Sequence, residues 1–238
     1  MNLSERKNIQ VPKTYQLALE VLGVFDVAKL LFQIPSFKSH PRGKGETILV
    51  LPGYATDDNI TFPLRKYLEF IGYSPRGWEI GTNHGHVPRL LRDIQSLVTD
   101  IYNSKGEKII LIGWSLGGYL AREIARDNPD KIESIISIGS PIFGGAKYTS
   151  IGNYYAERQN IDLDKLEQEI DERYQIPIKQ PGLSIYSKKD NVVSWQASVD
   201  TVSPYIKNIE MDATHLGLIL NPDVYFEIAK FLNKEQTT

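Results

Sequence analysis

A serine flanked by glycines stands in the segment Gly-Trp-Ser-Leu-Gly-Gly at residues 113–118. Residues 108–113 (KIILIG) form a β-branched apolar run typical of a buried strand, and residues 119–127 have the pattern of a helix. A side chain on a tight strand-to-helix turn points into the open, and flanking glycines let neighbouring backbone pack closely. Free N–H groups at the start of the helix suit a developing oxyanion. This context predicts that Ser115 is a nucleophile.

A serine nucleophile needs a base, and the chain has four histidines: His40, His84, His86 and His215. When the nucleophile lies on such a turn, the base follows it in the chain, on the loop after the last strand. Only His215 follows Ser115, and it stands between a weak strand pattern at residues 208–211 and a closing helix pattern at residues 224–232. We therefore expect His215 to be the base.

The pair His84 and His86 admits a metal-site interpretation. Gly85 separates the two residues, however, and no carboxylate stands at a helpful spacing. We expect instead that the pair shapes a loop near the mouth of a pocket. No metal ion and no organic cofactor is expected.

The base needs a carboxylate that fixes its tautomer and stabilises the imidazolium. Asp190 follows the strand pattern at residues 183–186 through a short turn, which places it between nucleophile and base at the carboxyl end of a strand. The chain order Ser, Asp, His favours it. Asp212, three residues before His215, is its rival, and Asp200 is a weaker alternative.

Two backbone donors must hold the oxyanion. The N–H of Leu116, directly after the nucleophile, is expected to be one of them. The second is expected from Tyr54, because Gly53 lets the loop after the strand pattern at residues 47–51 bend close to a substrate carbonyl. An ordinary Pro-Gly turn is the alternative interpretation of this loop.

Aromatic and apolar residues near these positions are compatible with a fatty acyl chain or an aryl ester. The residues expected to contact substrate are Trp114, Gly53, Leu216, Tyr148 and Tyr154. Ordinary core and cap packing is the alternative for the aromatic ones.

The elements that position these residues alternate along the chain. Strand patterns occur at residues 47–51, 108–113, 132–138, 183–186 and 208–211, and helix patterns at residues 63–71, 87–103, 119–127 and 224–232. Such alternation favours βαβ units, and therefore a parallel sheet with helices on both faces. We predict an α/β fold with a mostly parallel sheet of about six strands.

The chain is expected to form a single domain over residues 1–238. Residues 143–180 are too long for a simple loop and are expected to form an inserted cap or lid above the carboxyl ends of the strands, with a helix at about residues 162–174. Residues 1–45 have the pattern of a helical extension.

The apolar stretch at residues 17–34 of this extension contains Glu20, Asp26 and Lys29, which argues against a transmembrane helix. We favour an amphipathic helix packed on the domain. A lipid-surface anchor and a lining for an acyl-binding site stay open, so weak contact with a membrane surface through this helix or the cap is retained as a hypothesis.

Composition narrows the class further. The net charge of -2 gives no reason to expect nucleic acid as a partner. The chain has no cysteine, which excludes disulfides, thiolate metal sites and a cysteine nucleophile. The first residues show no signal-peptide pattern, and the expected location is the cytoplasm.

Roughly from residue 46 to residue 232, the motifs resemble those of the α/β-hydrolases. Leu-Pro-Gly-Tyr at residues 51–54 resembles the oxyanion loop, and residues 113–118 resemble the nucleophile elbow. Ser-Lys-Lys-Asp-Asn-Val-Val at residues 187–193 resembles the acid loop. Residues 215–222 resemble the histidine loop of a lipase-like or esterase-like branch. Two departures stand out. Many lipases carry His-Gly where this chain has Pro-Gly, and residues 1–45 replace the usual leading strand hairpin.

The resemblance implies a carboxylesterase-like or lipase-like serine hydrolase. It would act on a small-molecule or lipid ester through a Ser-His-Asp triad, with an acyl-enzyme intermediate and without a cofactor. Two alternatives stay open: an acyltransferase that uses the same acyl-serine, and a non-catalytic binding protein with this fold.

Overall fold

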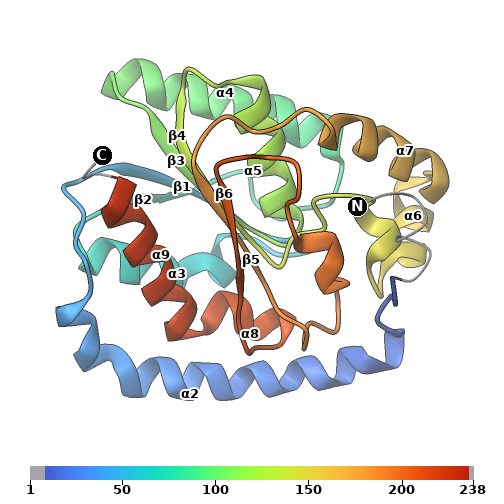
Figure 1. The fold of residues 1–238 in the computed structure, drawn as a ribbon, viewed down its shortest axis with the longest axis horizontal. Helices are drawn as coiled ribbons and strands as arrows, with labels where there is room; N and C mark the ends of the chain where they lie inside the picture. The colour runs from blue at the N-terminus through green and yellow to red at the C-terminus, as the bar shows by residue number, and fades with distance from the viewer. Residues whose placement is uncertain (1–8, 236–238) are drawn as a thin grey trace.

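Six parallel strands form one sheet in the computed structural model, which describes residues 9–235 (Figure 1). The order of the strands across the sheet is β2-β1-β3-β4-β5-β6, and every neighbouring pair is parallel. The strands are β1 (Thr47–Leu51), β2 (Ser74–Gly77), β3 (Ile109–Trp114), β4 (Ile132–Ile138), β5 (Gly182–Tyr186) and β6 (Ile206–Glu210). The predicted α/β class and the number of strands are confirmed.

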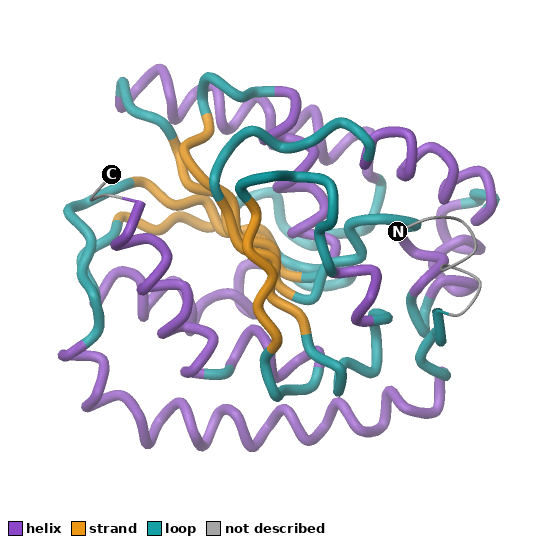
Figure 2. The backbone as a smooth tube through the Cα atoms, in the orientation of Figure 1, coloured by secondary structure: helices purple, strands orange, loops and turns teal. Residues whose placement is uncertain are grey.

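Helices cover both faces of this sheet, which Figure 2 shows crossing the centre of the molecule. The helices are η1 (Thr14–Gly23), α2 (Val24–Gln33), η2 (Ile34–Ser39), α3 (Asp58–Phe70), α4 (Val87–Lys105), α5 (Leu116–Asp127), η3 (Gly145–Tyr148), α6 (Gly152–Gln159), α7 (Leu163–Tyr174), η4 (Trp195–Ser198), α8 (His215–Leu220) and α9 (Pro222–Glu235). Helices α4 and α5 pack on one face, whereas α3, α8 and α9 pack on the other.

Alternation along the strands builds these two cores. Successive strand residues point to opposite faces, so Ile48 and Val50 join the core under α3, α8 and α9. Leu49 and Leu51 join the core under α4 and α5. All four side chains are fully buried, which explains why this strand appears in the sequence as a continuous apolar run.

Strand β2 and the start of helix α3 differ from the sequence prediction. Strand β2, with the sequence Ser-Pro-Arg-Gly, has no apolar pattern and was not predicted; it lies at the sheet edge, where a proline without an N–H is tolerated. Helix α3 begins five residues earlier than the pattern at residues 63–71 indicates. Asp57 caps it by accepting a 2.9 Å hydrogen bond from the Asn59 N–H, and Pro63 lies inside the helix.

The strand order reverses direction between β1 and β3. The chain leaves β1 toward β2 at one edge, returns through α4 to β3, and then proceeds through β4 and β5 to β6 at the other edge. In open parallel sheets, ligands bind outside the carboxyl ends of the strands at such a reversal point. The loop that contains Tyr54 follows β1 and the turn at Ser115 follows β3, so both lie at this point.

The segment expected to form a cap contains η3, α6 and α7, which lie beyond the ends of the strands in Figure 1. Helix α7 matches the helix expected at about residues 162–174. A small apolar cluster anchors the segment; it contains Phe143, Tyr148, Tyr174 and Val193. The bounds of the cap and its movement as a lid stay predictions.

Within the amino-terminal extension, η1, α2 and η2 form a nearly continuous helical rod (Figure 1), and residues 1–8 of the extension lie outside the described residues. It packs against α8 so closely that a Cβ on Gly23 would lie 2.9 Å from the backbone nitrogen of Gly217. No helix in the described part of the chain is long and apolar enough to cross a membrane.

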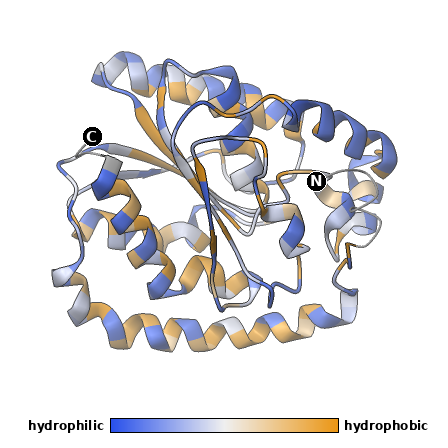
Figure 3. Ribbon diagram, viewed as in Figure 1, coloured by the Kyte–Doolittle hydropathy of each residue, from blue (hydrophilic) through white to orange (hydrophobic). Residues whose placement is uncertain are grey.

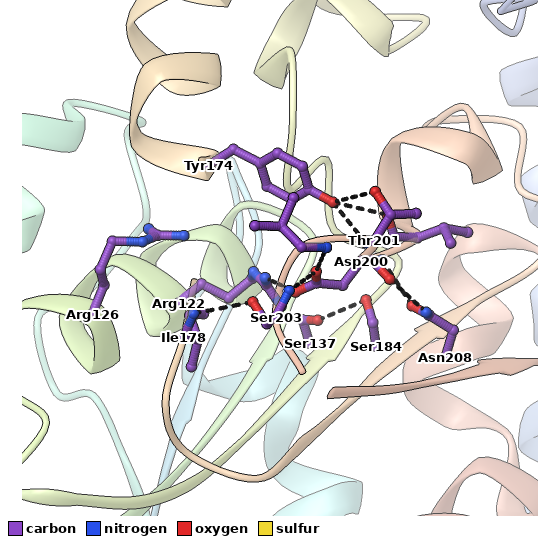
Figure 4. Close-up of polar contacts among 12 residues, drawn as sticks. Arg122, Arg126, Ser137, Tyr174, Ile178, Ser184, Asp200, Thr201, Ser203 and Asn208 are labelled. Atoms are coloured by element: carbon purple, nitrogen blue, oxygen red, sulfur yellow. Dashed lines mark hydrogen bonds and ion pairs between the residues drawn. The ribbon is translucent and has the colours of Figure 1, made fainter. Parts of the chain in front are cut away.

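A buried ion pair joins α5 to the loop before β6 (Figure 4). The Arg122 guanidinium donates to Asp200, and both side chains are almost fully buried. The other Asp200 oxygen accepts 2.8 Å hydrogen bonds from the N–H groups of Val202 and Ser203. Burial alone would raise the pKa of Asp200, but Arg122 and these N–H donors outweigh burial and hold the pKa below its usual range.

Replacing Asp200 with alanine should lower the free energy of unfolding by about 3–5 kcal/mol, because it leaves Arg122 buried without its partner. Urea titration measures this difference. The matched control is Asp212→Ala, which breaks an exposed pair with Lys189 and should cost about 0–1 kcal/mol. Equal losses in both variants would contradict this assignment.

The pair also makes the stability of the parent chain depend on pH. Because the pKa of Asp200 is depressed in the folded chain, the stabilisation of the fold by Asp200 is present above its unfolded pKa and should disappear as the pH falls through the folded value.

Candidate active site

The Ser115 turn is a strained connection between β3 and α5. Ser115 has φ 55° and ψ −125°, a region that non-glycine residues rarely adopt. The flanking glycines are required by close packing: a Cβ on Gly113 would lie 2.2 Å from the Gly117 carbonyl oxygen, and a Cβ on Gly117 would lie 2.3 Å from the Leu51 carbonyl oxygen. The predicted strand, turn and helix are therefore present, with the serine partly exposed at the turn.

Asp190 and His215 are in direct contact, although 25 residues separate them in the chain. Oδ2 of Asp190 lies 2.7 Å from Nδ1 of His215. Oδ1 accepts hydrogen bonds of 2.8 and 2.7 Å from the N–H groups of Val192 and Val193, which fixes the carboxylate in the acid loop. His215 is the first residue of α8, a helix that Thr214 caps through the Gly217 N–H.

The charge of the His215 ring depends on this carboxylate. Burial alone would lower the pKa of the imidazolium. The Asp190 carboxylate outweighs burial, with a further contribution from Glu20, and the pKa of His215 is raised above its ordinary value. The ring is thus held in an environment that stabilises a positive charge, as a general base requires after it has accepted a proton.

Gly139, directly after β4, brings the nucleophile turn and the acid–base pair to one place. The Ser115 N–H donates a 2.8 Å hydrogen bond to the carbonyl of Ile138, the residue directly before Gly139. A Cβ on Gly139 would lie 3.2 Å from both Asp190 Oδ2 and His215 Nδ1, so a larger residue would press on the pair.

Trp114 forms the second link between these elements. Its indole Nε1 donates a 3.1 Å hydrogen bond to the His215 carbonyl, and the two ring centroids lie 5.0 Å apart. Within residues 9–235, no hydrogen bond joins the Ser115 hydroxyl to the His215 ring. Catalytic contacts are often long without substrate and tighten when it binds.

The two rival carboxylates lie in other interactions. Asp212 has an exposed side chain 2.6 Å from Nζ of Lys189, on the surface. Asp200 is buried with Arg122, as described above. Of the three carboxylates considered, the structure brings Asp190 to the His215 ring; the roles of the three site residues stay predictions.

The expected oxyanion donors flank the same turn. Leu116 is the first residue of α5, so its N–H has no partner within the helix. In the loop after β1, the N–H groups of Ala55 and Thr56 are bonded to protein carbonyls, and the structure shows no acceptor for the Tyr54 N–H among residues 9–235. A Cβ on Gly53 would lie 3.0 Å from the Ser115 Cβ, which places this loop directly beside the nucleophile turn.

Asn83 supports this loop and was not predicted from the sequence. Its side chain is fully buried, and Nδ2 donates a 3.0 Å hydrogen bond to the Pro52 carbonyl. Its backbone exchanges hydrogen bonds of 2.8 Å with Ala55 and Thr56. A buried asparagine with this many bonds fixes the path of the loop, but a single polar residue in a loop gives no sequence signal for that role.

The neighbouring histidines shape the next part of the loop. His86 caps α4 by accepting from the Arg89 N–H at 3.4 Å, and the Gly85 carbonyl accepts a 2.7 Å hydrogen bond from the Tyr155 hydroxyl. No group of three or more side chains that could bind a metal ion occurs among the residues that the structure describes.

Ser115 opens into an apolar cavity between the sheet edge and the cap. No charged residue or histidine lines it; the lining consists of Tyr54, Val87, Ser115, Leu116, Tyr119, Pro141, Gly145, Ala146, Thr149, Ile151, Tyr155, Leu166, Ile170, Val192 and Val193. The two expected oxyanion residues thus belong to the lining, and no residue of the amino-terminal helix does.

The residues expected to contact substrate are placed elsewhere. Trp114 and Gly53 pack beneath the turn, and Leu216, on α8, lies beside Gly23 of the amino-terminal helix. Tyr148 is buried in the cap with its hydroxyl on Glu167, and Tyr154 is exposed. None of the five lines the cavity, whereas Tyr155, Leu166 and Ile170 of the cap do. Successive residues of a helix point in different directions, so Tyr155 of α6 is buried while its neighbour Tyr154 is exposed.

Glu20 joins the amino-terminal helix to both loops of the acid–base pair. Its Oε1 accepts hydrogen bonds from the backbone N–H and the side-chain Nδ2 of Asn191, at 3.1 and 3.0 Å. Its Oε2 accepts from the Leu216 N–H at 2.7 Å. Asn191 follows Asp190 and Leu216 follows His215, so one carboxylate holds the two loops together. The sequence pattern shows Glu20 only as a charge that interrupts an apolar helix.

Replacing Glu20 with glutamine should lower the pKa of His215, because the substitution removes a negative charge that favours the imidazolium. An NMR titration of the ring can measure this, since the chain has only four histidines. The matched control is Asp26→Asn on the same helix, because Asp26 bonds to Asn221 rather than to Asn191 or Leu216 and is not among the groups that shift the pKa of His215. An unchanged His215 pKa in the Glu20 variant would refute the electrostatic coupling.

Comparison with known proteins shows the same fold. A family model described as "alpha/beta hydrolase fold" matches residues 68–168. The chain is 23% identical over 192 residues to palmitoyl-protein thioesterase ABHD10, mitochondrial, of Bos taurus, covering 66% of this chain and 61% of that protein. It is 26% identical over 106 residues to pimeloyl-(acyl-carrier protein) methyl ester esterase of Shewanella woodyi, covering 41% of this chain and 37% of that protein. Both matches therefore span less than two thirds of the relative's length.

A solved structure adds a longer match. Est1E from Butyrivibrio proteoclasticus, with ferulic acid bound, superposes with a TM-score of 0.62 at 18% identity and covers 82% of this chain and 91% of its own. This likeness extends the agreement in fold well beyond the segment that the family model matches. By its parallel sheet, its strand order and these matches, the chain has the α/β-hydrolase fold.

Proposed function

We propose that the protein is a serine hydrolase that cleaves esters of apolar acyl groups, with Ser115 as nucleophile, His215 as base and Asp190 as the orienting acid. One observation carries the proposal: the buried Asp190–His215 hydrogen bond lies at the sheet edge where the strained Ser115 turn opens into an apolar cavity. The similarity to proteins named as an esterase and a thioesterase supports the same reaction class.

The proposed reaction has two acyl-transfer steps. Ser115 Oγ attacks the substrate carbonyl carbon while its proton passes to Nε2 of His215, and the N–H groups of Tyr54 and Leu116 bind the tetrahedral oxyanion. The bond to the leaving oxygen then breaks, and the imidazolium returns the proton to that oxygen. Water, deprotonated by the same ring, then attacks the carbonyl carbon of the acyl-serine. The bond to Ser115 Oγ breaks, the imidazolium returns its proton to Oγ, and the acid is released.

The lining of the cavity supports an uncharged acyl group. It contains no charged side chain, so a carboxylate or ammonium placed there would lose its hydration without gaining a partner. The polar groups that it does contain are the hydroxyls of Ser115, Thr149 and three tyrosines. An aliphatic or aromatic acyl chain would instead exchange water for apolar contact.

A thioester is the second candidate substrate, because the chain is similar to a protein named as a palmitoyl-protein thioesterase. The nucleophile, base and oxyanion donors would act on a thioester carbonyl in the same way. The two substrate classes differ in the leaving group, and the apolar lining of the cavity suits the acyl group that they share.

A matched pair of esters tests the proposal. The p-nitrophenyl ester of hexanoate and the mono-p-nitrophenyl ester of adipate have acyl chains of equal length, but the adipate ester ends in a carboxylate. We expect kcat/KM for the hexanoate ester to exceed that for the adipate ester about tenfold or more. Palmitoyl-coenzyme A tests the thioester in the same assay.

Three outcomes would contradict the proposal. Equal rates for the two esters would contradict an apolar acyl site. Transfer of the acyl group to an added alcohol in preference to water would identify an acyltransferase. No turnover of any ester or thioester, together with no covalent labelling of Ser115, would identify a binding protein with this fold.

A further inference from the structure

The amino-terminal helix has its polar residues turned toward the protein. Between residues 14 and 37 the charged residues are Glu20, Asp26 and Lys29, and each is half-buried. Glu20 binds the two loops described above, Asp26 accepts a 2.9 Å hydrogen bond from Asn221, and Lys29 pairs with Asp223. The charges of this helix therefore lie on the side that packs against the domain.

The opposite side of the same helix is apolar and faces solvent. We call it the outer face and define it by Tyr15, Val21, Val24, Phe25, Leu31 and Phe32. Phe32 is 87% exposed and Phe25 is 72% exposed, and the other four are also exposed. Figure 3 shows the apolar residues along this helix at the lower edge of the molecule. An exposed apolar surface that continues over several helical turns marks an interaction site, since scattered single residues are the norm.

The charges around the outer face select the kind of partner. In residues 9–45 the exposed charged side chains are all basic: Lys13 precedes the outer face, and Lys38, Arg42 and Lys44 follow it. An apolar stripe with basic residues at both ends is typical of a helix that lies in the interface of an anionic membrane. Each basic residue near such a surface adds to the electrostatic attraction.

The same charges disfavour a second copy of the chain as the partner. Symmetric pairing of two outer faces would place the helices antiparallel or parallel. The antiparallel arrangement sets Lys13 of one copy near Lys38 of the other, and the parallel arrangement sets equal residues together. Like charges meet in both cases, which costs affinity.

The geometry fits a helix lying on the surface. From residue 15 to residue 32 the rod extends for roughly 30 Å, at about 2.0 Å per residue in the 3-10 helix η1 and about 1.5 Å per residue in α2. Its other side is occupied by α8 and the loops that Glu20 joins, so only the outer face is free to enter lipid. The amino end of the rod meets the cap, where Oγ1 of Thr14 donates to the Ser150 carbonyl. Ser150 lies between two residues that line the cavity, so docking would bring this side of the cavity close to lipid.

We propose that the outer face docks on the surface of a membrane that contains anionic lipid, with the helix in the plane of the interface and its flanking basic residues at the headgroups. This proposal is independent of the hydrolase reaction. It accounts for a helix whose polar side is used within the protein and whose apolar side is left uncovered.

Vesicle flotation of the full chain tests the docking directly. Vesicles of phosphatidylcholine that contain phosphatidylglycerol should bind the parent chain, and pure phosphatidylcholine should bind it more weakly. The double variant Phe25→Asp with Phe32→Asp should lose at least about tenfold in binding. The matched control is Tyr205→Asp, because Tyr205 is 65% exposed but lies in the loop before β6. It should bind as the parent does.

A labelled variant keeps the test valid if the aspartate variants fail to fold. The chain has no cysteine, so Phe32→Cys and Tyr205→Cys each accept a single environment-sensitive fluorophore. The label at position 32 should shift to the blue with anionic vesicles, and the label at position 205 should not. No flotation and no shift would overturn the proposal. A dimer in light scattering that the double variant abolishes, without vesicle binding, would show that a second copy covers the outer face.

Discussion

Ser115→Ala should abolish measurable ester hydrolysis, with kcat lowered by a factor on the order of 10⁵ to 10⁶. The hydroxyl is the only group at this turn that can form the acyl-enzyme, and Ser115 is the one serine in the cavity lining. Removing it leaves the oxyanion donors and the cavity in place, so substrate should still bind. Initial rates with p-nitrophenyl hexanoate measure the effect, and inhibition by the product acid measures retained binding.

The control for this substitution is Ser104→Ala, which removes a serine from the last turn of α4, outside the residues that line the cavity, and should leave kcat unchanged. Urea unfolding checks that Ser115→Ala retains the stability of the parent. Hydrolysis by a well-folded Ser115→Ala chain within tenfold of the parent rate would show that another group performs the chemistry.

Asp190→Asn should lower kcat/KM by about 10⁴-fold, because the amide no longer selects the tautomer that presents a basic Nε2 to Ser115. The pH dependence should change as well. Hydrolysis requires neutral His215, so the activity of the parent should fall as the pH drops through the raised pKa of this ring. Without the Asp190 carboxylate that pKa is lowered, and the acid limb of the weak remaining activity should move to lower pH.

Asp212→Asn is the matched control for this prediction. Asp212 lies three residues before His215 in the chain but pairs with Lys189 on the surface. Its variant should keep both the rate and the acid limb of the parent. A large loss in Asp212→Asn with a small one in Asp190→Asn would reverse the assignment of the acid and would require a different arrangement of the loops in solution.

The parts of the fold that sequence could predict are those fixed by local physics. Strands β1, β3, β4 and β5 are buried on both faces, so each appears as an apolar run. The turn at Ser115 needs glycines on both sides, because backbone atoms approach within 2.3 Å of where a Cβ would stand. These signals lie within a few residues of one another, and a single sequence is enough to detect them.

The parts that sequence could not predict depend on contacts between distant residues. Edge strand β2 pairs only through its backbone with β1, so its side chains carry no pattern. The bonds of Glu20 to Asn191 and Leu216 span more than 170 residues. The lining of the cavity depends on which sides of α6 and α7 face the sheet. On α6, for example, Tyr155 lines the cavity, whereas its neighbour Tyr154 is exposed to solvent. Helical periodicity shows that one face of a helix is apolar, but it does not show what lies against that face.

Covalent capture of Ser115 tests the central claim most directly. The parent chain is treated with a fluorophosphonate, and the intact mass and the peptide that contains residue 115 are measured by mass spectrometry. We predict one adduct per chain, located on Ser115, with the rate of its formation lowered in Asp190→Asn and unchanged in Asp212→Asn. An unmodified residue 115 in a folded chain, or an adduct on another residue, would contradict the account.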